Sequence, residues 1–184
     1  SILLRKPFSK VDFEEFLEER KRTIMRAIQT QLIDDIIELP EHLKILDSKV
    51  EAVELDLRRL IVQKFGDNIE NYKNVVPQHI QDLVQRRILD NLKKRPEENI
   101  SNYNSFSSRI ENFNVSDYLE IIISKPHWHL FENHFKDKNQ CTVRFNQFGT
   151  LRNGIRHSKN VSEIEKLDGE ASIKWFSSVF NNTI

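Results

Sequence analysis

The sequence predicts an all-α protein, and two observations lead to that prediction. Apolar residues recur at steps of three and four along most of the chain, which is the pattern of helices that turn one face toward a core. The 184 residues include only four glycines and five prolines, and the prolines lie between the apolar runs, where they can begin or end helices. We expect a helical domain at residues 41–184, preceded at residues 1–40 by a helical extension or a linker from a larger protein.

The expected helices follow one another along the chain. The first spans residues 10–38, and the charged side chains on its outer face are expected to be solvated. Later helices are expected at residues 41–65, 77–94, 114–124, 126–135 and 169–180, with a helix that contains residues 145–157 before the last one. Gly66 is expected to end the second helix and Pro77 to begin the third, because glycine favours the position after a helix and proline favours the first turn.

Residues 99–114 are expected to form either a long loop or a partly ordered excursion, and to be mobile, since their asparagines and serines leave little apolar surface to bury. Two aromatic residues in this segment, Tyr103 and Phe106, allow two interpretations. They can pack against the core, which is the simpler expectation, or they can stack on the bases of single-stranded RNA.

The overall charge argues against a strong field around the molecule, whereas one region is locally basic. Lys+Arg and Asp+Glu number 28 each, so the chain as a whole is not drawn to nucleic acid or to a membrane. Two acidic residues, Glu132 and Asp137, lie between Lys125 and Lys159, together with these seven basic ones: Lys125, Lys136, Lys138, Arg144, Arg152, Arg156 and Lys159. This local excess favours an anionic ligand.

The cellular setting is predicted from what the sequence does not contain. Cys141 is the single cysteine, so we expect neither a disulfide framework nor a cysteine-based metal site. No charged-then-apolar leader opens the chain, and no apolar run reaches the ~18 residues of a membrane span. We therefore expect a soluble, cytoplasmic protein without membrane contact. Because the sequence begins Ser-Ile-Leu, we also expect it to be fused to further domains.

Most of the residues suited to chemistry lie between positions 145 and 157. An apolar stripe recurs there at steps of three and four: Phe145, Phe148, Leu151 and Ile155. On a helix, Asn153, Arg156 and His157 share one arc on the other side, and Arg152 stands at the border of the stripe. Histidine moves protons near neutral pH, and arginine stabilises negative charge that develops on phosphorus, so this group suits cleavage of a phosphodiester without a metal. A solvated helix face is the simpler interpretation of the same side chains.

The segment from Pro126 to Phe135 contains three histidines and a glutamate, which raises the question of a metal site. His129 and Glu132 can share one helical face, but the other two histidines do not converge with them, and no His-Glu-x2-His motif is present. We expect no metal and no cofactor. The aromatic residues of this segment are expected to attach its helix to the core: Trp128, Phe131 and Phe135.

The Arg152-Asn153-x3-His157 spacing resembles the signature of the HEPN superfamily (higher eukaryotes and prokaryotes nucleotide-binding domains), which is Arg-x(4–6)-His. The surrounding segments are similar to one branch of it, and the resemblance spans roughly residues 45 to 180. They are Val53–Ile61, Val76-Pro77, Tyr118–Ile123 and Trp128-x2-Phe131-x3-Phe135. That branch is found as the C-terminal domain of a nuclear RNA quality-control endoribonuclease and as a module of bacterial conflict proteins.

The resemblance implies a HEPN-like helical bundle that forms a homodimer and cleaves RNA without a metal. Arg152, Asn153 and His157 correspond to the catalytic positions, with His157 transferring the proton and Arg152 stabilising the extra charge on phosphorus. The products would carry a 2′,3′-cyclic phosphate and a 5′-hydroxyl. Arg156, Arg144 and Lys159 are expected to bind the RNA, although related sequences usually have a small residue where Arg156 stands.

Two other functions fit the same sequence. The domain can be a non-catalytic dimerisation module, or a nucleotide- or RNA-binding accessory module, of a larger nuclease or restriction protein. It can also be a helical protein-interaction domain in which the motif is fortuitous, in which case it binds neither RNA nor nucleotide. If it is a nuclease, we expect it to act in bacterial defence or in RNA processing.

Overall fold

The computed structural model describes residues 14, 17–26, 41–95, 97–156 and 161–181 of the chain. The chain divides into two units, Ser1–Pro40 and Glu41–Ile184. In the first unit residues 17–26 are helical, and most of the helix expected at residues 10–38 lies outside the described residues. The second unit contains helices and no strand among its described residues, so the all-α prediction is confirmed.

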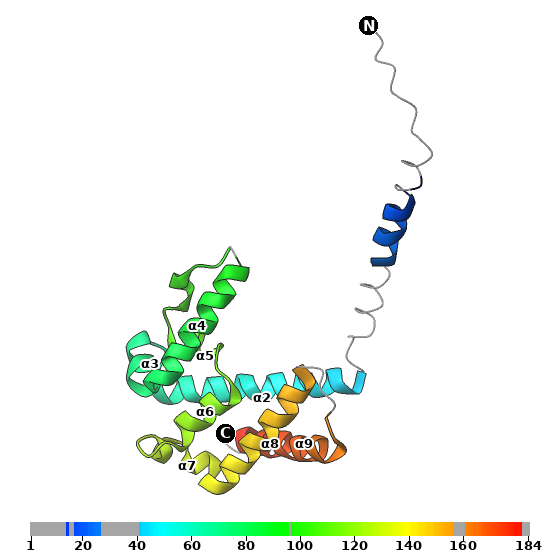
Figure 1. The fold of residues 1–184 in the computed structure, drawn as a ribbon. Coiled ribbons are helices and arrows are strands. Elements are labelled where there is room, and N and C mark those ends of the chain that lie inside the picture. Colours follow the sequence, from blue (N-terminus) through cyan, green and yellow to red (C-terminus); the bar gives the residue numbers. More distant parts are fainter. Residues whose placement is uncertain (1–13, 15–16, 27–40, 96, 157–160, 182–184) are drawn as a thin grey trace. The chain divides into compact units, whose positions relative to one another are not determined.

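The helices of the second unit are arranged around a long first helix (Figure 1). In chain order they are α2 (Glu41–Phe65), α3 (Ile69–Val75), α4 (Gln78–Lys94), the 3₁₀ helix η1 (Ile100–Tyr103), α5 (Phe106–Ile110), α6 (Val115–Ile123), α7 (Trp128–Phe135), α8 (Lys138–Arg156) and α9 (Glu163–Asn181). Helix α2 contacts α3, α5, α6, α8 and α9. No helix in the described part of the chain is both long and apolar enough to span a lipid bilayer.

The predicted helix boundaries hold best where glycine or proline marks them. Helix α2 has the predicted bounds, and Gly66 follows it with a φ of 81°, a conformation that side chains with a Cβ disfavour. Pro77 precedes α4, as predicted. Helix α9 begins at Glu163 rather than at Gly169, because Ser162 and Glu165 cap it reciprocally at 2.8 and 3.2 Å. Helix α3 was not predicted.

Of the two expectations for residues 99–114, the long loop is wrong, because this segment contains the short helices η1 and α5. Two of the polar residues that suggested a loop, Asn99 and Ser105, are helix caps. Asn99 and Ser105 accept hydrogen bonds from backbone N–H groups two and three residues later, at 3.0 and 3.1 Å. Tyr103 and Phe106 are buried, so of the two interpretations the structure supports packing against the core.

Aromatic rings join α7, α8 and α9 into one core. The ring of Phe176 on α9 lies edge-on against Phe145 and Phe148 of α8, at centroid distances of 4.9 and 5.3 Å. Phe135 of α7 contacts Phe145 at 6.1 Å, and Phe131 is fully buried, so both residues attach α7 to the core as predicted. This packing turns the apolar stripe of α8 inward and leaves Arg152 and Arg156 on the side of α2.

The closest approach of α8 and α9 depends on a glycine. A Cβ atom at Gly169 would lie 2.4 Å from the Cβ of Leu151, which is attached directly to the backbone of α8 and cannot rotate away. At Gly149, by contrast, a Cβ would lie 3.5 Å from Val115 Cγ1, which is an ordinary contact. Substitution by alanine is therefore expected to have opposite effects at Gly169 and Gly149.

We expect Gly169→Ala to lower the free energy of unfolding by about 1–2 kcal/mol, because the cost of overpacking exceeds the gain in helix propensity. Gly149→Ala is the matched control and should leave stability unchanged or raise it by up to about 1 kcal/mol. Urea unfolding followed by circular dichroism measures both. A stabilised Gly169→Ala protein would contradict the close helix contact.

Candidate functional site

A buried carboxylate on α2 holds both arginines of the motif. The side chain of Glu54 is 3% exposed, and its two oxygens accept hydrogen bonds from different arginines of α8. Arg152 Nε donates to Glu54 Oε1 at 3.0 Å, and Arg156 Nη2 donates to Glu54 Oε2, also at 3.0 Å. A buried carboxylate is costly unless it is paired in this way, so the three side chains fix α8 against α2.

The same carboxylate has a third basic neighbour, which extends the cluster to α6. Arg58 lies one helical turn after Glu54, and its Nη2 is 3.6 Å from Glu54 Oε2. Arg58 Nε donates to the hydroxyl of Tyr118 on α6 at 3.0 Å, and this hydroxyl donates to the carbonyl of Ile110 at 3.2 Å. Burial raises the pKa of Tyr118 to about 12, so the phenol stays protonated at neutral pH and keeps its donor.

A second carboxylate partly neutralises the cluster. Asp47 Oδ1 is buried without a hydrogen-bond partner and lies 3.8 Å from Arg156 Nε. We call the group formed by Asp47, Glu54, Arg58, Arg152 and Arg156 the ion cluster. Its three guanidiniums and two carboxylates leave one net positive charge.

The residues predicted for the site do not all come together. Arg152 and Arg156 join the ion cluster, and Asn153 is exposed beside them, where its Oδ1 accepts a hydrogen bond from Arg152 Nη1 at 3.1 Å. Arg144 lies apart from the cluster and donates to Gln147 Oε1 at 3.3 Å. His157 and Lys159 lie outside the described residues. The interpretation as a solvated face fails for Arg152, whose side chain is only 16% exposed and bonds a buried carboxylate.

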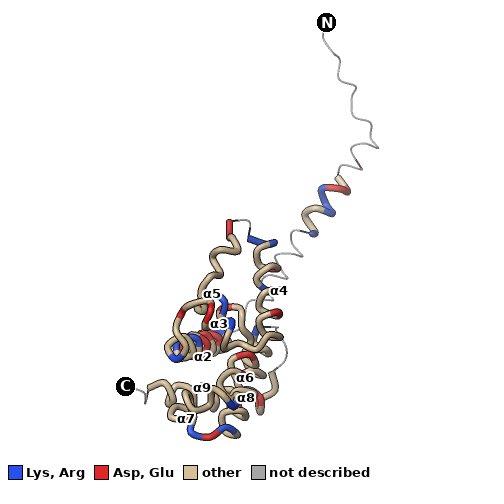
Figure 2. Tube along the Cα trace, turned by 90° about the vertical axis from the view of Figure 1, so that its left-hand side faces the viewer, with Lys and Arg blue, Asp and Glu red and all other residues tan. Residues whose placement is uncertain are grey.

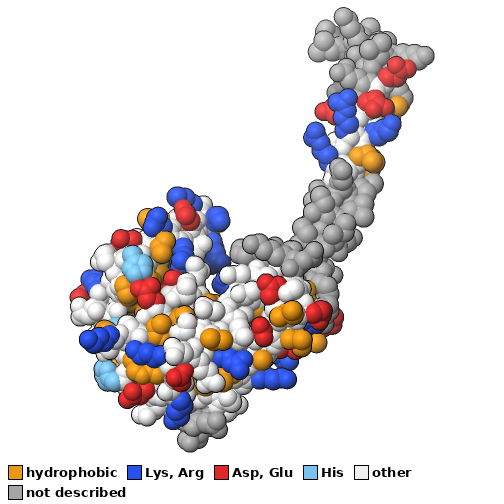
Figure 3. Space-filling model, turned by 60° about the horizontal axis from the view of Figure 1, so that its bottom comes forward, with side chains coloured by type: hydrophobic (Ala, Val, Ile, Leu, Met, Phe, Trp, Pro, Cys, Tyr) orange, Lys and Arg blue, Asp and Glu red, His pale blue; other side chains and the backbone are white. Residues whose placement is uncertain are grey.

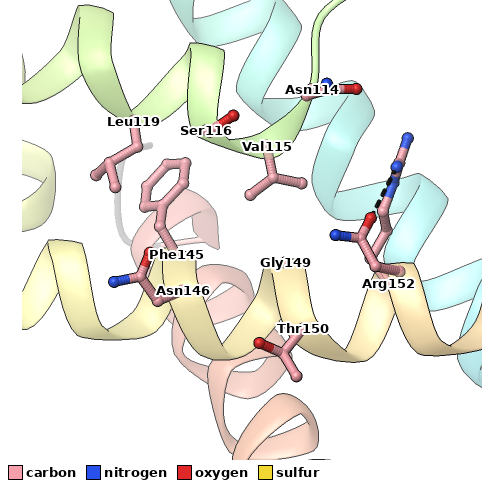
Figure 4. Close-up of a pocket in the computed structure, with 10 residues that line it drawn as sticks. Asn114, Val115, Ser116, Leu119, Phe145, Asn146, Gly149, Thr150 and Arg152 are labelled. Atoms are coloured by element: carbon pink, nitrogen blue, oxygen red, sulfur yellow. Dashed lines mark hydrogen bonds between the residues drawn. The ribbon is translucent and has the colours of Figure 1, made fainter.

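A groove of about 550 Å³ lies between α6 and α8 and ends at Arg152 (Figure 4). Its lining residues are Asn114, Val115, Ser116 and Leu119 from α6 and its N-cap, and Phe145, Asn146, Gly149, Thr150, Arg152 and Asn153 from α8. In the close-up the Phe145 ring lies between Leu119 and Val115, and Arg152 rises from α8 toward Asn114 at one end. Arg152 is the only charged residue among those that line it.

In the views of Figures 2 and 3 the described basic residues do not gather into one broad patch. Residues of both signs occur along α2, which Figure 2 shows nearly end-on. On the face of the molecule shown in Figure 3, basic and acidic side chains are likewise interspersed. Attraction of an anion to the face shown there therefore depends on individual residues and not on a general field.

The three histidines in and next to α7 lie in different surroundings. His127 Nδ1 lies 3.3 Å from the carbonyl oxygen of Ile121, His129 is exposed, and His134 Nδ1 is buried without a partner. Burial lowers the pKa of His134, with Lys64 and Lys136 adding to the shift. Among the described residues, no three His, Cys, Asp or Glu side chains are grouped so that they could hold a metal ion.

Trp128, expected in the core beside these histidines, is only half-buried. Its ring lies 5.3 Å from the Nζ of Lys138, at the start of α8. The attachment of α7 therefore depends on Phe131 and Phe135, which are fully buried. A cation over a partly exposed tryptophan ring adds less than a buried aromatic side chain does.

Glu54 is the residue of the site that sequence reasoning missed. A signal for it is present, because Glu54 occupies a position of the apolar stripe of α2 that runs through Val50, Leu57 and Ile61. A charged residue at such a position must find a partner of opposite charge inside the fold. The sequence does not tell which of the 28 basic residues is that partner, since the partners lie about a hundred positions away.

A double-mutant cycle tests whether the ion cluster is a buried interaction. We expect Glu54→Gln and Arg152→Met to show a coupling free energy of about 1–3 kcal/mol in unfolding experiments. Asp56 and Arg59 on the same helix are a matched exposed pair at 3.5 Å, and their cycle (Asp56→Asn, Arg59→Met) should give less than about 0.5 kcal/mol. Equal coupling in the two cycles would contradict a buried cluster.

Comparisons with known proteins identify no relative of this chain. No protein-family model matches it. No curated protein and no solved structure matches it either. What the protein does therefore has to be inferred from the ion cluster, from the groove beside it and from the motif residues themselves.

Proposed function

We propose that this chain contains a metal-independent endoribonuclease domain of the HEPN type, which cleaves RNA through Arg152 and His157 in a homodimer. The proposal combines the resemblance of residues 45–180 to that superfamily with the chemistry at the end of α8. The domain would work within a larger protein of bacterial defence or RNA processing.

The orientation of Arg152 is the observation that supports the proposal most. Its Nε is taken by Glu54 and its Nη1 by Asn153, whereas its Nη2 has no partner among the described residues. Guanidinium groups carry five N–H donors, so an arginine whose Nε and Nη1 are held in place keeps the N–H groups of Nη2 for a phosphate. A buried carboxylate thus orients Arg152 at the end of a groove, and a phosphodiester that enters the groove would meet its free donors.

In the proposed cleavage reaction, His157 carries out the proton transfers. The 2′-oxygen of the ribose attacks the phosphorus, and the bond from phosphorus to the 5′-oxygen of the next nucleotide breaks. One imidazole takes the proton of the 2′-hydroxyl, and a second gives a proton to the leaving 5′-oxygen. The products are a 2′,3′-cyclic phosphate and a 5′-hydroxyl. DNA is not cleaved because it lacks the attacking hydroxyl.

The contacts of Arg156, the residue before His157, are relevant to the proposed role of this histidine. Arg156 is the last described residue of α8 and immediately precedes His157. It bonds Glu54 and lies close to Asp47, so its guanidinium is tied to α2 and its charge is compensated. The chain is thus held firmly up to the position before the histidine. We assign Arg156 to positioning more than to RNA binding.

A non-catalytic accessory module is the second candidate, and one observation favours it. The ion cluster neutralises most of the charge of its three arginines, and the groove carries no other charged lining residue. A site of this kind can bind a nucleotide without supplying the charge that cleavage requires. It would bind RNA or nucleotide and leave it intact.

Cleavage experiments distinguish the two candidates. We expect the protein to cleave single-stranded RNA in EDTA and to leave cyclic phosphate ends, with His157→Ala lowering the rate about 10²–10⁴-fold, the usual contribution of an acid–base group. His129→Ala replaces an exposed histidine of α7 and is the matched control, which should cleave like the unchanged protein. An RNA with one 2′-deoxynucleotide should resist cleavage after that nucleotide.

A test of Arg152 requires a substitution that keeps a positive charge beside Glu54. Arg152→Ala would leave Glu54 with one partner fewer, so loss of activity could reflect loss of folding. Arg152→Lys keeps the charge and should fold but cleave much more slowly, because lysine lacks the fork of donors. Cleavage that requires a divalent ion, or that persists in His157→Ala, would refute the catalytic proposal.

The oligomeric state provides a separate prediction. One Arg–His pair supplies one acid–base group, whereas the reaction uses a base and an acid, so two copies are needed to complete the site. We expect a symmetric homodimer by light scattering or sedimentation at tens of micromolar protein. A strictly monomeric protein that still cleaves RNA would contradict the composite site.

A further inference from the structure

The groove between α6 and α8 has a composition that is unusual for a phosphate-binding surface. Apart from Arg152 at one end, its lining consists of neutral polar and apolar residues, without aspartate, glutamate or lysine. We propose that this groove binds the nucleoside adjoining the phosphate that Arg152 holds, so that a nucleotide of single-stranded RNA is its ligand. The inference rests on the proposed function and adds a specificity site to it.

The two sides of the groove suit the two parts of a nucleoside. Val115, Leu119 and Phe145 are the apolar residues of the lining, as Figure 4 shows. Val115 and Phe145 are largely buried, so Leu119 is the residue that offers most apolar surface to a base or sugar. Ser116 on the α6 side and Asn146 and Thr150 on the α8 side are exposed. Their side chains make no hydrogen bond with any residue that the structure describes, so their donors and acceptors are free for a ligand.

The size and charge of the groove agree with this ligand. Its volume of about 550 Å³ falls within the range of roughly 300–1,000 Å³ that is typical of small-molecule pockets. The absence of carboxylates from the lining means that nothing in it repels the phosphodiester chain. A single guanidinium at one end places one phosphate there and leaves the rest of the groove for uncharged groups.

The groove should distinguish between bases. Proteins that bind single strands without preference stack successive bases on exposed aromatic rings. Here the one aromatic ring in the lining, Phe145, is 1% exposed and cannot offer its face. Recognition must instead use the amide of Asn146 and the hydroxyls of Ser116 and Thr150, which bond base edges and ribose hydroxyls selectively. We therefore expect binding, and any cleavage, to depend on the nucleotide in the groove.

Calorimetric titration of the full chain with nucleotides tests the inference. The ligands are the four nucleoside 3′- and 5′-monophosphates, the matching nucleosides and inorganic phosphate. We expect at least one monophosphate to bind more tightly than its nucleoside and than phosphate alone. The triple variant Ser116→Ala, Asn146→Ala, Thr150→Val should weaken that binding at least about tenfold, since hydrogen bonds are lost.

Asn139→Ala is the matched control, because Asn139 is an exposed asparagine of the same helix outside the groove. It should leave affinity unchanged, and thermal unfolding should show that both variants keep the fold. The inference is overturned if no monophosphate binds, if phosphate binds as tightly as the nucleotides, or if the triple variant binds like the unchanged protein.

Mapping of cleavage sites separates this inference from the proposed function. If cleavage depends on His157 and the triple variant changes the preferred nucleotide, both stand. If cleavage depends on His157 but the triple variant cuts the same sites at the same rates, the groove assignment fails and the nuclease proposal stands. If no RNA is cut while nucleotides bind in a groove-dependent way, the nuclease proposal fails and the groove assignment stands.

Discussion

The pairing of Glu54 with the arginines around it is the interaction on which the rest of the site depends. A carboxylate that is 3% exposed would be strongly destabilising alone, and each of its oxygens has an arginine partner at 3.0 Å. Because Glu54 belongs to α2 and its two close partners to α8, the pairing sets the rotation and register of these helices. Arg58 and Tyr118 carry the same network to α6, so one buried charge relates three helices to each other.

Packing on the opposite side of α8 explains why its polar residues face the groove. Phe145 and Phe148 lie against Phe176 of α9, and Gly169 lets the two helices approach at Leu151. With the apolar stripe used in this way, the remaining sides of α8 can face only α2, α6 or solvent. Arg152 thus reaches the buried carboxylate through its Nε, while its Nη2 has no partner among the described residues and Arg152 lines the end of the groove.

This arrangement is relevant to function because some donors of Arg152 fix the position of its side chain while another has no partner among the described residues and is available to a ligand. Glu54 and Asn153 restrict the guanidinium of Arg152, so little conformational freedom would be lost when a phosphate binds it. The neutral lining beside it offers hydrogen bonds without adding charge. A composition of this kind favours selective recognition of a neutral group next to one phosphate over general attraction to a polyanion, which also agrees with the mixed charges of the face shown in Figure 3.

The amino-acid sequence by itself determined the all-α class, the bounds of α2, the start of α4 and the inward stripe of α8, because periodicity and Gly or Pro boundaries are local properties. Local reading failed at residues 99–114, where serine and asparagine that suggest a loop also serve as helix caps. It also placed Arg152 and Arg156 on the motif helix but left open whether they are solvated. Only the tertiary structure decided that, because their partner, Glu54, lies about a hundred residues earlier, and burial and ion pairing over such a separation depend on how helices pack.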